Sequence, residues 1–524
     1  MAKQRQRSKQ HAPATDKREA KVRARREARR DARRAPLAAR TAPAEQPRFW
    51  FGFEVTWAKL LLARVVLFAL LAIDAVLSIR HAPRYGAGGF NVAHVPGLDA
   101  LGPTRATYAI AQLVSAYLFV LVAFGVGTRY ALPVVTAIYA WLYFGSQLDS
   151  YQHHYLVVLL LLLACFVPWQ RPADATPATP VRSWAVRLML VQLGIMYLWA
   201  AISKLDVAWL DGRTLHEQIT GSLRHAIDAT IGITWTARLV VVTELVLAVI
   251  VWVRPAWIVA APLGIAFHAG ILKTGLEIGL FAWLMLGLYV LVVPDRLWVW
   301  IAETPPLRVL RAVLGRVAAA DSWIALGLGA LGTALALATR LHHAVAVAVG
   351  LAVFTALIVV TAKRRGERVG PVGIAHVVAI AVWLLVDRAS TVAFDYYNFW
   401  GGSQRRLGKV EAAEVAYREL ADRFPDDARG HYRLGELLVR RNDLEGLGEL
   451  HEAQRLEPLQ PRAYMAEAEY LARTGKQAEA IAKAQEATYA DPSSQAARDL
   501  VDRLTGAGKP ATPAAADDDP DDAP

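Results

Sequence analysis

The sequence has a single cysteine among 524 residues, Cys165, and it lies inside an apolar run. One cysteine cannot close a disulfide within the chain, so a disulfide-stabilised scaffold is excluded. The sequence also lacks the periodic apolar stripes of a fully soluble protein, because its hydrophobic residues, 55% of the total, come in long runs. Such a chain is too apolar to be disordered over most of its length, and it is long enough for several domains.

Net charge is nearly absent from most of the chain. Residues 1–48 hold 16 Lys/Arg and 5 Asp/Glu, so this arm carries +11 of the total of +12. The arm lacks the apolar core of a cleavable signal peptide. We therefore expect a disordered or helical cytoplasmic arm that acts as a topological signal before the first membrane span. Binding to RNA or anionic lipid is the alternative. Residues 507–524 are predicted to be an acidic disordered tail with five aspartates.

Eleven apolar runs between Trp57 and about Leu385 are long enough, or nearly so, to cross a bilayer core, which takes about 20 helical residues. They lie near residues 57–79, 107–127, 130–147, 154–168, 184–203, 237–253, 256–273, 277–294, 322–339, 343–361 and 373–388. We therefore predict an all-α, polytopic helical membrane bundle of about 11 spans. The Lys/Arg content of the loops then alternates as the positive-inside rule requires. This alternation predicts a bacterial-type inner membrane protein with a cytoplasmic N-terminus and its C-terminal part outside, in the periplasm.

The chain changes character after Asp395, where charge rises and the apolar spacing becomes helical. Three prolines recur at intervals of 33 and 34 residues, and three small turn residues recur in phase with them: Pro425, Pro458 and Pro492, with Gly408, Asn442 and Gly475. This period and this turn are typical of tetratricopeptide repeats. Residues 391–506 are therefore predicted to form a tetratricopeptide-repeat α-solenoid. Such a solenoid binds an extended protein or peptide segment, or it only packs against the membrane domain.

Ionisable residues in or beside apolar spans are candidates for function because they are costly to place in lipid. The strongest candidate is Lys204, at the end of the run Tyr197-Leu-Trp-Ala-Ala-Ile-Ser-Lys204-Leu-Asp206-Val-Ala-Trp209-Leu-Asp-Gly212. A lysine partly withdrawn from water gives up its proton more readily and can act as a base. Alternatively, Lys204 only extends to the membrane surface, with Trp209 in the aromatic belt.

Histidines and one buried acid are the other candidates. His153, His154 and Tyr155 open the fourth run, where histidines could move protons or bind a metal. Adjacent residues on a helix point about 100° apart, and no third ligand follows at a recognisable spacing, so no metal is predicted. His268 in the seventh run and Glu244 in the sixth are packing residues or pocket residues. In the predicted topology four of these ionisable residues lie toward the outer face, which favours one shared pocket: Lys204, His153, His268 and Lys273.

The block Tyr-x-x-Ala-x-x-x-Lys-Leu-Asp-x-x-Trp-Leu-x-Gly, from Tyr197 to Gly212, resembles the signature of the vitamin K-dependent γ-carboxylase family. Bacterial members of that family are called HTTM (horizontally transferred transmembrane) proteins. The resemblance covers residues 49–300 and leaves residues 301–390 as additional transmembrane helices. The chain departs from the family at Ala201, where the family often has glycine, and it lacks the β-rich C-terminal part of the animal enzymes.

The resemblance implies a chemistry. In the family, the lysine that matches Lys204 is the base that deprotonates vitamin K hydroquinone. Reaction with O2 then yields a base able to remove a proton from the γ-carbon of a glutamate, which takes up CO2. By the same resemblance His153 lies beside the substrate glutamate, and His268 belongs to the pocket. The rest of the implied substrate and quinone pocket is His154, Tyr155, Tyr197, Asp206, Trp209 and Glu244.

The expected function is therefore that of a γ-glutamyl carboxylase-like membrane enzyme, a carbon–carbon lyase. Its co-substrates would be a menaquinol-like reduced vitamin K-type quinone, O2 and CO2, and no metal is expected. It would carboxylate or oxidise a protein or peptide recruited by the repeats. Nucleic acid is not an expected partner.

Two other function classes stay open. A polytopic lipid-linked glycosyltransferase predicts an essential acidic residue or arginine in an outer loop. The largest early loop, residues 79–105, offers only a few: Asp99, Arg80, Arg84 and Arg105. A membrane-anchored tetratricopeptide scaffold for protein assembly predicts that Lys204 and His153 can be replaced without consequence.

Overall fold

The chain folds almost entirely into helices, in a computed structural model that describes residues 50–506 apart from several gaps. The gaps are residues 87–92, 96, 149–151, 171–174, 220, 275–279, most of 310–343, 365–368, 389–390 and 493. The predicted basic arm, the acidic tail and most of the ninth apolar run lie outside the described residues. Residues from Val55 onward form one unit, whose fold is described below.

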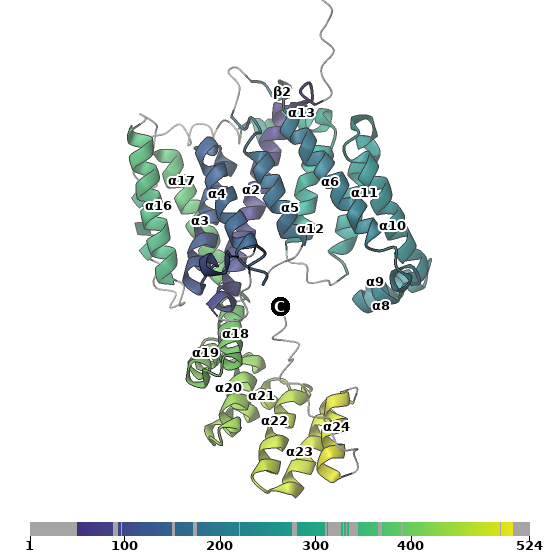
Figure 1. The fold of residues 1–524 in the computed structure, drawn as a ribbon, viewed down its shortest axis with the longest axis vertical. Coiled ribbons are helices and arrows are strands. Elements are labelled where there is room, and N and C mark those ends of the chain that lie inside the picture. The colour runs from purple at the N-terminus through teal and green to yellow at the C-terminus, as the bar shows by residue number, and fades with distance from the viewer. Residues whose placement is uncertain are drawn as a thin grey trace, which may run out of the picture. The chain divides into compact units, whose positions relative to one another are not determined.

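Within the described residues, helices occupy ten of the eleven predicted apolar runs (Figure 1). They are α2 (Trp57–Ser78), α3 (Arg105–Phe124), α4 (Thr128–Phe144), α5 (Gln152–Ala164), α6 (Trp184–Ile202), α10 (Ile233–Ile250), α11 (Trp257–Ile271), α12 (Phe281–Val292), α16 (Ala344–Arg364) and α17 (Gly370–Arg388). From α2 to α12, each of these helices packs against the next. The pair α16 and α17 also packs against α3, so these two helices extend the same bundle.

Four of the described helical stretches are long and apolar enough to cross a membrane. They are Trp57–Tyr85, Arg105–Phe124, Trp184–Ile202 and Ile233–Ile250. The first exceeds α2 because the 3-10 helix η1 (Ile79–Gly86) continues it. A fifth candidate is α12 together with α13 (Asp295–Glu303), two helices bent by 93° at the break between them. The chain is therefore a membrane protein.

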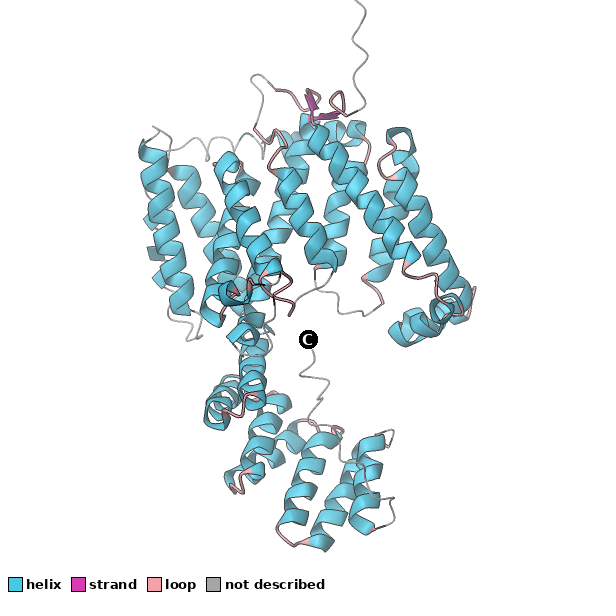
Figure 2. Ribbon diagram, viewed as in Figure 1, coloured by secondary structure: helices cyan, strands magenta, loops and turns pink. Residues whose placement is uncertain are grey.

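Two three-residue strands depart from the expected all-α fold. β1 (Glu54–Thr56) pairs with β2 (Pro180–Arg182), shortly before α2 and α6 begin (Figure 2). The backbone N–H of Trp57, the first residue of α2, donates to the Thr179 carbonyl oxygen at 2.8 Å. Since the first N–H groups of a helix have no partner within it, the strand pair both satisfies a donor and ties the starts of α2 and α6 together.

Short helices fill the segment between α6 and α10. They are α7 (Val207–Leu210), α8 (Arg213–Gln218) and α9 (Gly221–Asp228). Two short 3-10 helices lie in other parts of the chain: η2 (Asp99–Leu101) precedes α3, and η3 (Arg254–Ala256) precedes α11. Trp209, Leu215 and Ile219 pack against Ala201 of α6 and Val241 of α10 in one apolar cluster. This cluster holds the segment after Lys204 against the bundle.

Seven helices follow the bundle in the part of the chain that the structure describes. They are α18 (Thr391–Arg406), α19 (Val410–Arg423), α20 (Ala428–Arg440), α21 (Glu445–Leu456), α22 (Pro461–Arg473), α23 (Gln477–Ala490) and α24 (Gln495–Thr505). Each packs against the next, and α20, α22 and α24 also pack in sequence against one another. The turn residues Gly408, Asn442 and Gly475 all have left-handed backbone, with φ of +69°, +60° and +85°. Each of the three prolines lies two residues beyond the end of a helix, as expected for a residue that cannot continue one.

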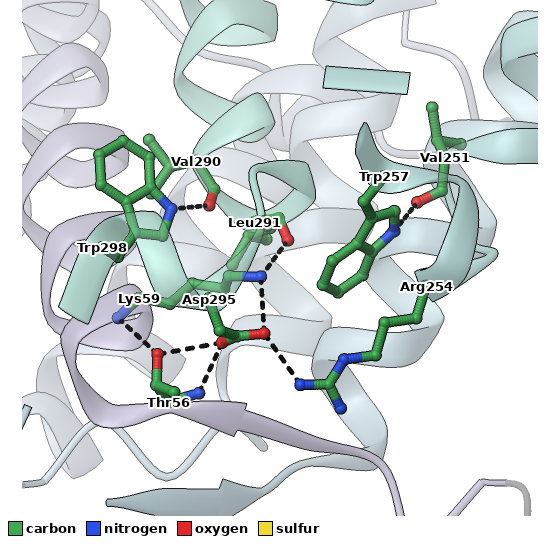
Figure 3. A network of polar contacts seen from close by, with 9 residues as sticks. All are labelled: Thr56, Lys59, Val251, Arg254, Trp257, Val290, Leu291, Asp295 and Trp298. Carbon is green, nitrogen blue, oxygen red and sulfur yellow. Dashed lines mark hydrogen bonds and ion pairs between the residues drawn. The ribbon is translucent and has the colours of Figure 1, made fainter. Parts of the chain in front are cut away.

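A polar network joins the start of α2 to the start of α13 (Figure 3). One oxygen of the Asp295 carboxylate accepts hydrogen bonds from the backbone N–H and the hydroxyl of Thr56, at 2.8 and 3.0 Å. The other oxygen pairs with Lys59 Nζ at 3.3 Å and with the Arg254 guanidinium at 3.0 Å. One carboxylate therefore holds together residues that lie more than 230 positions apart in the sequence.

Lys59 is fully buried in this network. Besides Asp295, its ammonium donates to the Leu291 carbonyl oxygen at 3.1 Å and lies 3.9 Å from the centre of the Trp257 indole ring. That indole is itself fixed, because its N–H donates to the Val251 carbonyl oxygen at 2.9 Å. Anion, carbonyl and aromatic face together replace the water that the ammonium loses.

We expect Asp295→Ala to lower the free energy of unfolding by about 3–5 kcal/mol, because it leaves a buried ammonium without its anion. The measurement is heat unfolding of the purified protein in detergent. Arg254→Gln is the matched control: its side chain is 50% exposed, so its loss should cost less than about 1 kcal/mol. Equal losses for the two variants would show that Asp295 does not compensate Lys59.

Candidate active site

Lys204 forms an ion pair with Glu244. It lies two residues beyond the end of α6, and its Nζ donates to the two carboxylate oxygens at 2.9 and 3.1 Å. The Lys204 side chain is 21% exposed and that of Glu244 is 6% exposed. The sequence predicts Glu244 only as a packing or pocket residue, whereas the structure makes it the counter-ion of the lysine. An acid buried in one apolar helix and a lysine at the end of another was the signal available in the sequence.

The end of α6 and the turn after it position the ammonium. Lys204 Nζ also donates to the Ala200 carbonyl oxygen, one turn back, at 3.1 Å. Its charge lies 5.2 Å from the centre of the Trp209 ring, and the indole N–H donates to the Ala237 carbonyl oxygen at 3.2 Å. Trp209 is buried within the protein and presents its aromatic face to the ammonium of Lys204.

The remaining residues of the Lys-Leu-Asp-x-x-Trp-Leu-x-Gly block build the turn. Asp206 caps α7 by accepting a hydrogen bond from the Trp209 backbone N–H at 2.9 Å. Gly212 has φ of +88°, and a Cβ there would lie 3.1 Å from the backbone of Thr234. The Asp211 side chain is 40% exposed, and hydrogen bonds from the backbone N–H and side chain of Arg213 hold the pKa of Asp211 below the usual range. Asp206, Gly212 and Asp211 shape the backbone around the site, and Asp206 is exposed.

Tyr197, His268 and Tyr289 form a buried hydrogen-bonded triad. The Tyr197 hydroxyl lies 2.5 Å from Nε2 of His268 and 2.8 Å from the Tyr289 hydroxyl. The other histidine nitrogen, Nδ1, is buried and has no hydrogen-bond partner within the described part of the chain. Tyr289 was not among the residues predicted from the sequence, although a tyrosine hydroxyl inside an apolar run such as 277–294 needs a partner.

Gly264 of α11 makes room for this triad. A Cβ at position 264 would lie 1.8 Å from the Tyr289 hydroxyl oxygen, well inside van der Waals contact. Tyr289 is fully buried. The glycine therefore allows α11 and α12 to approach closely enough for Tyr289 to reach Tyr197.

His153 and His154 lie in the first turn of α5. Their ring centres are 4.3 Å apart, and His153 also packs against Phe281 at 5.2 Å. His154 Nδ1 lies 2.7 Å from the Tyr139 hydroxyl of α4. The described residues contain no group of three His, Cys, Asp or Glu that could hold a metal ion.

A cavity of about 1600 Å³ brings most of the predicted residues together. Seven of the nine line it: His153, His154, Tyr197, Lys204, Trp209, Glu244 and His268. Apolar side chains, among them Met196, Val240 and Phe267, also line it. Residues of η1 and α18 line it too, including Arg80 and Asp395, which pair at 3.0 Å. Tyr155 is not among the lining residues: it is 46% exposed and packs against Tyr143.

Substituting the two members of the Lys204–Glu244 pair separately and together should reveal a coupling of about 0.5–3 kcal/mol in the free energy of unfolding. Lys204→Met and Glu244→Gln should each destabilise the protein. The first leaves the Glu244 carboxylate without its cation, and the second leaves the Lys204 ammonium without its anion. The double variant should then lose less than the sum of the two single losses. Heat unfolding in detergent gives the three values, and strictly additive losses would mean that the two groups do not interact.

Gly264→Ala should destabilise the protein by about 1–3 kcal/mol, because the added methyl group overpacks a filled interior and displaces Tyr289. Gly270→Ala, on the same helix, is the matched control, since a Cβ there meets nothing within 4 Å. The same unfolding measurement compares the two. A Gly264 variant as stable as the Gly270 variant would contradict the close approach of α11 and α12.

Comparison with protein families and with curated proteins gives two findings. Residues 54–298 match the family model described as HTTM domain. No curated protein matches the chain. The matched segment contains the Lys204–Glu244 pair and the tyrosine–histidine triad, and its two ends meet at the Asp295 network. The HTTM part of the resemblance carried by Tyr197–Gly212 is confirmed: residues 54–298 of this membrane protein match the HTTM domain.

Proposed function

We propose that this protein is an integral membrane enzyme resembling vitamin K-dependent γ-carboxylase. It would use a reduced quinone, O2 and CO2 to carboxylate, or oxidise, a protein or peptide substrate. The observation that carries the proposal is the Lys204–Glu244 pair on the wall of a cavity of about 1600 Å³. Some of the residues that line this cavity belong to the segment that matches the HTTM domain.

The lining of the cavity fits a quinol. A flat apolar ring needs apolar walls, and Met196, Val240 and Phe267 supply them. A ring hydroxyl needs a hydrogen-bond partner, and the buried Nδ1 of His268 has none within the described residues. When bound, a quinol would supply the reducing equivalents and the acidic hydroxyl of the reaction. A lipid-soluble molecule can also reach such a site from the bilayer without passing through water.

Lys204 is the proposed base, and Glu244 is its proton partner. A lysine accepts a proton only as the neutral amine. Transfer of one proton from Nζ to the Glu244 carboxylate, over 2.9 Å, turns the ion pair into a neutral amine beside a carboxylic acid. No charge is then left uncompensated in the apolar surroundings. The amine can take the hydroxyl proton of a bound quinol while Glu244 holds the first one.

The triad is proposed to hold the substrate ring in place. Tyr197 is bound on both sides, by His268 and by Tyr289, so His268 is fixed in orientation while Nδ1 stays available. His153 lines the same cavity from α5, where it would contact the glutamate side chain of the second substrate.

The helices α18–α24 are proposed to be tetratricopeptide repeats that recruit the protein substrate. The 33- and 34-residue proline spacing, the helix pairs and the left-handed turn residues support this assignment. α18 contacts η1 of the membrane domain. Substrate held by the helices would therefore start close to the cavity that Lys204 lines.

The proposed topology has eleven spans, a cytoplasmic N-terminus and the repeats outside a bacterial-type inner membrane. Helices in ten of the eleven apolar runs and the Lys/Arg content of the loops support it. The second candidate function is a tetratricopeptide scaffold, in which the membrane part is only an anchor. It is supported by the C-terminal helices, which pack against one another in an array of their own. A lipid-linked glycosyltransferase is less favoured, because Arg80, one of its few candidate residues in the early outer loop, is paired with Asp395.

The test is quinol turnover by the full protein in lipid, supplied with a reduced naphthoquinone, O2 and bicarbonate. We expect quinone epoxide from the wild type and a loss of at least about 100-fold in Lys204→Ala, since a positioned base contributes about 10²–10⁴-fold. Lys273→Ala is the matched control, because Lys273 is an exposed lysine at the end of α11 and should leave turnover unchanged.

Two results would count against the proposal. Epoxide from Lys204→Ala at the wild-type rate would remove the lysine from the mechanism. No epoxide from any folded variant, with several quinols tried, would reject the carboxylase chemistry and favour the scaffold.

A further inference from the structure

A second groove lies on the C-terminal helices, away from Lys204. It has a volume of about 480 Å³ and is formed by α20, α22 and α24. These three helices pack in sequence against one another, so the groove crosses consecutive helix pairs. Arg440 and Arg473 border it from the last residues of α20 and α22, and Arg503 borders it from the last turn of α24.

More guanidinium groups than carboxylates line this groove. Two acids also line it, Glu436 and Glu469. Arg440 pairs with Glu436 at 2.8 Å, and Arg503 pairs with Glu469 at 3.4 Å. Arg473 donates to the Val439 carbonyl oxygen at 2.8 Å and has no carboxylate partner in the described part of the chain. Three cations against two anions leave the groove positive.

The existing ion pairs leave the arginines able to bind another anion. The Arg440 side chain is 45% exposed and that of Arg503 is 48% exposed. Exposed pairs of this kind contribute only about 0–1 kcal/mol. An arginine presents five N–H donors, so each arginine can donate to a second carboxylate without giving up the first. Small and apolar residues, including Ala466 and Leu500, also line the groove.

The chain itself supplies a segment of complementary chemistry. Residues 507–524 follow α24, whose last turn borders the groove, and they contain five aspartates and one lysine, a net charge of −4. All five aspartates lie within residues 517–522, and alanine and proline make up most of the rest. Proline favours extended backbone, and small apolar residues suit the alanine and leucine surface of the groove.

The reach of the segment is sufficient. The ten residues 507–516 separate α24 from the first aspartate. Extended at roughly 3 Å per residue, they span about 30 Å. Neighbouring helices lie about 8–10 Å apart, so the path from α24 across α22 to α20 is about 20 Å. A tethered segment of this length has an effective concentration on the order of 1 mM at the groove.

We propose that the Arg440–Arg473–Arg503 groove is a binding site for an acidic extended segment, and that residues 507–524 of the same chain occupy it. The aspartates at 517–522 would bind the guanidinium groups, and the alanine- and proline-rich spacer would cross α24 and α22. An acidic segment of another protein could then enter the groove only by displacing this tail. This inference is independent of the quinol chemistry proposed for Lys204.

The experiment measures binding of a fluorescent peptide with the sequence of residues 507–524 to the full protein in detergent, by anisotropy. Two forms of the protein are compared: the wild type, and a form in which the five aspartates of its own tail are changed to asparagine. We expect the neutralised-tail form to bind the added peptide at least about 10-fold more tightly, because its own tail no longer competes. Binding should weaken as salt is raised.

Groove variants locate the site. Adding Arg440→Gln and Arg503→Gln to the neutralised-tail form should abolish most of the binding. Both side chains are half-exposed, so the fold should be kept. Arg455→Gln is the matched control, since Arg455 is 65% exposed and pairs with Glu452 on α21, which does not line the groove. It should leave peptide binding unchanged.

Either of two outcomes would overturn the proposal. Equal peptide affinity for the wild type and the neutralised-tail form would mean that the tail does not occupy the groove, which would then serve an acidic segment of another protein. Equal affinity for the groove variant and the Arg455 variant would mean that these arginines do not form the site.

Discussion

An ammonium group among apolar helices is stable only beside an anion, and two such pairs organise the membrane domain. Lys59 is fully buried and Lys204 is one-fifth exposed, and each lies against a carboxylate from a helix distant in the sequence. Because an uncompensated charge in lipid costs several kcal/mol, each pair forces two helices to meet at a defined height. The lysine–carboxylate pairs thus constrain the register of the helices that apolar packing alone would leave free to slide.

The two pairs differ in what surrounds them. The Asp295 carboxylate is shared by Lys59, Arg254 and Thr56, and every donor is committed to closing the domain. Glu244 pairs with Lys204, and both line a large cavity. A closed network suits a structural role, whereas a two-member pair on a cavity wall can exchange a proton with a bound molecule. The same chemistry therefore serves stability in one place and reactivity, as proposed, in the other.

The Tyr197–Gly212 block illustrates how one motif combines both roles. Lys204 carries the proposed chemistry, whereas Trp209, Gly212 and Asp206 shape the turn that presents it. Glycine is required at 212 by its left-handed φ and by the nearby Thr234 backbone. Asp206 is a helix cap, so its part in the block is to fix the backbone. The tyrosine at the start of the block joins His268 and Tyr289 instead.

The sequence alone determined the helical character, the positions of the apolar helices and the turns between the C-terminal helices, and it marked Lys204 as a candidate site residue. These features depend on runs, periods and single backbone conformations that are local in the chain. Only the tertiary structure decided that Glu244 is the partner of Lys204, that Tyr289 completes the triad, and that Asp295 closes the domain on Lys59. Each of these pairs joins residues 40 to 236 positions apart, and no local pattern specifies which buried donor meets which acceptor. That choice follows from packing, because a buried polar group accepts whichever partner the folded helices bring within hydrogen-bonding distance.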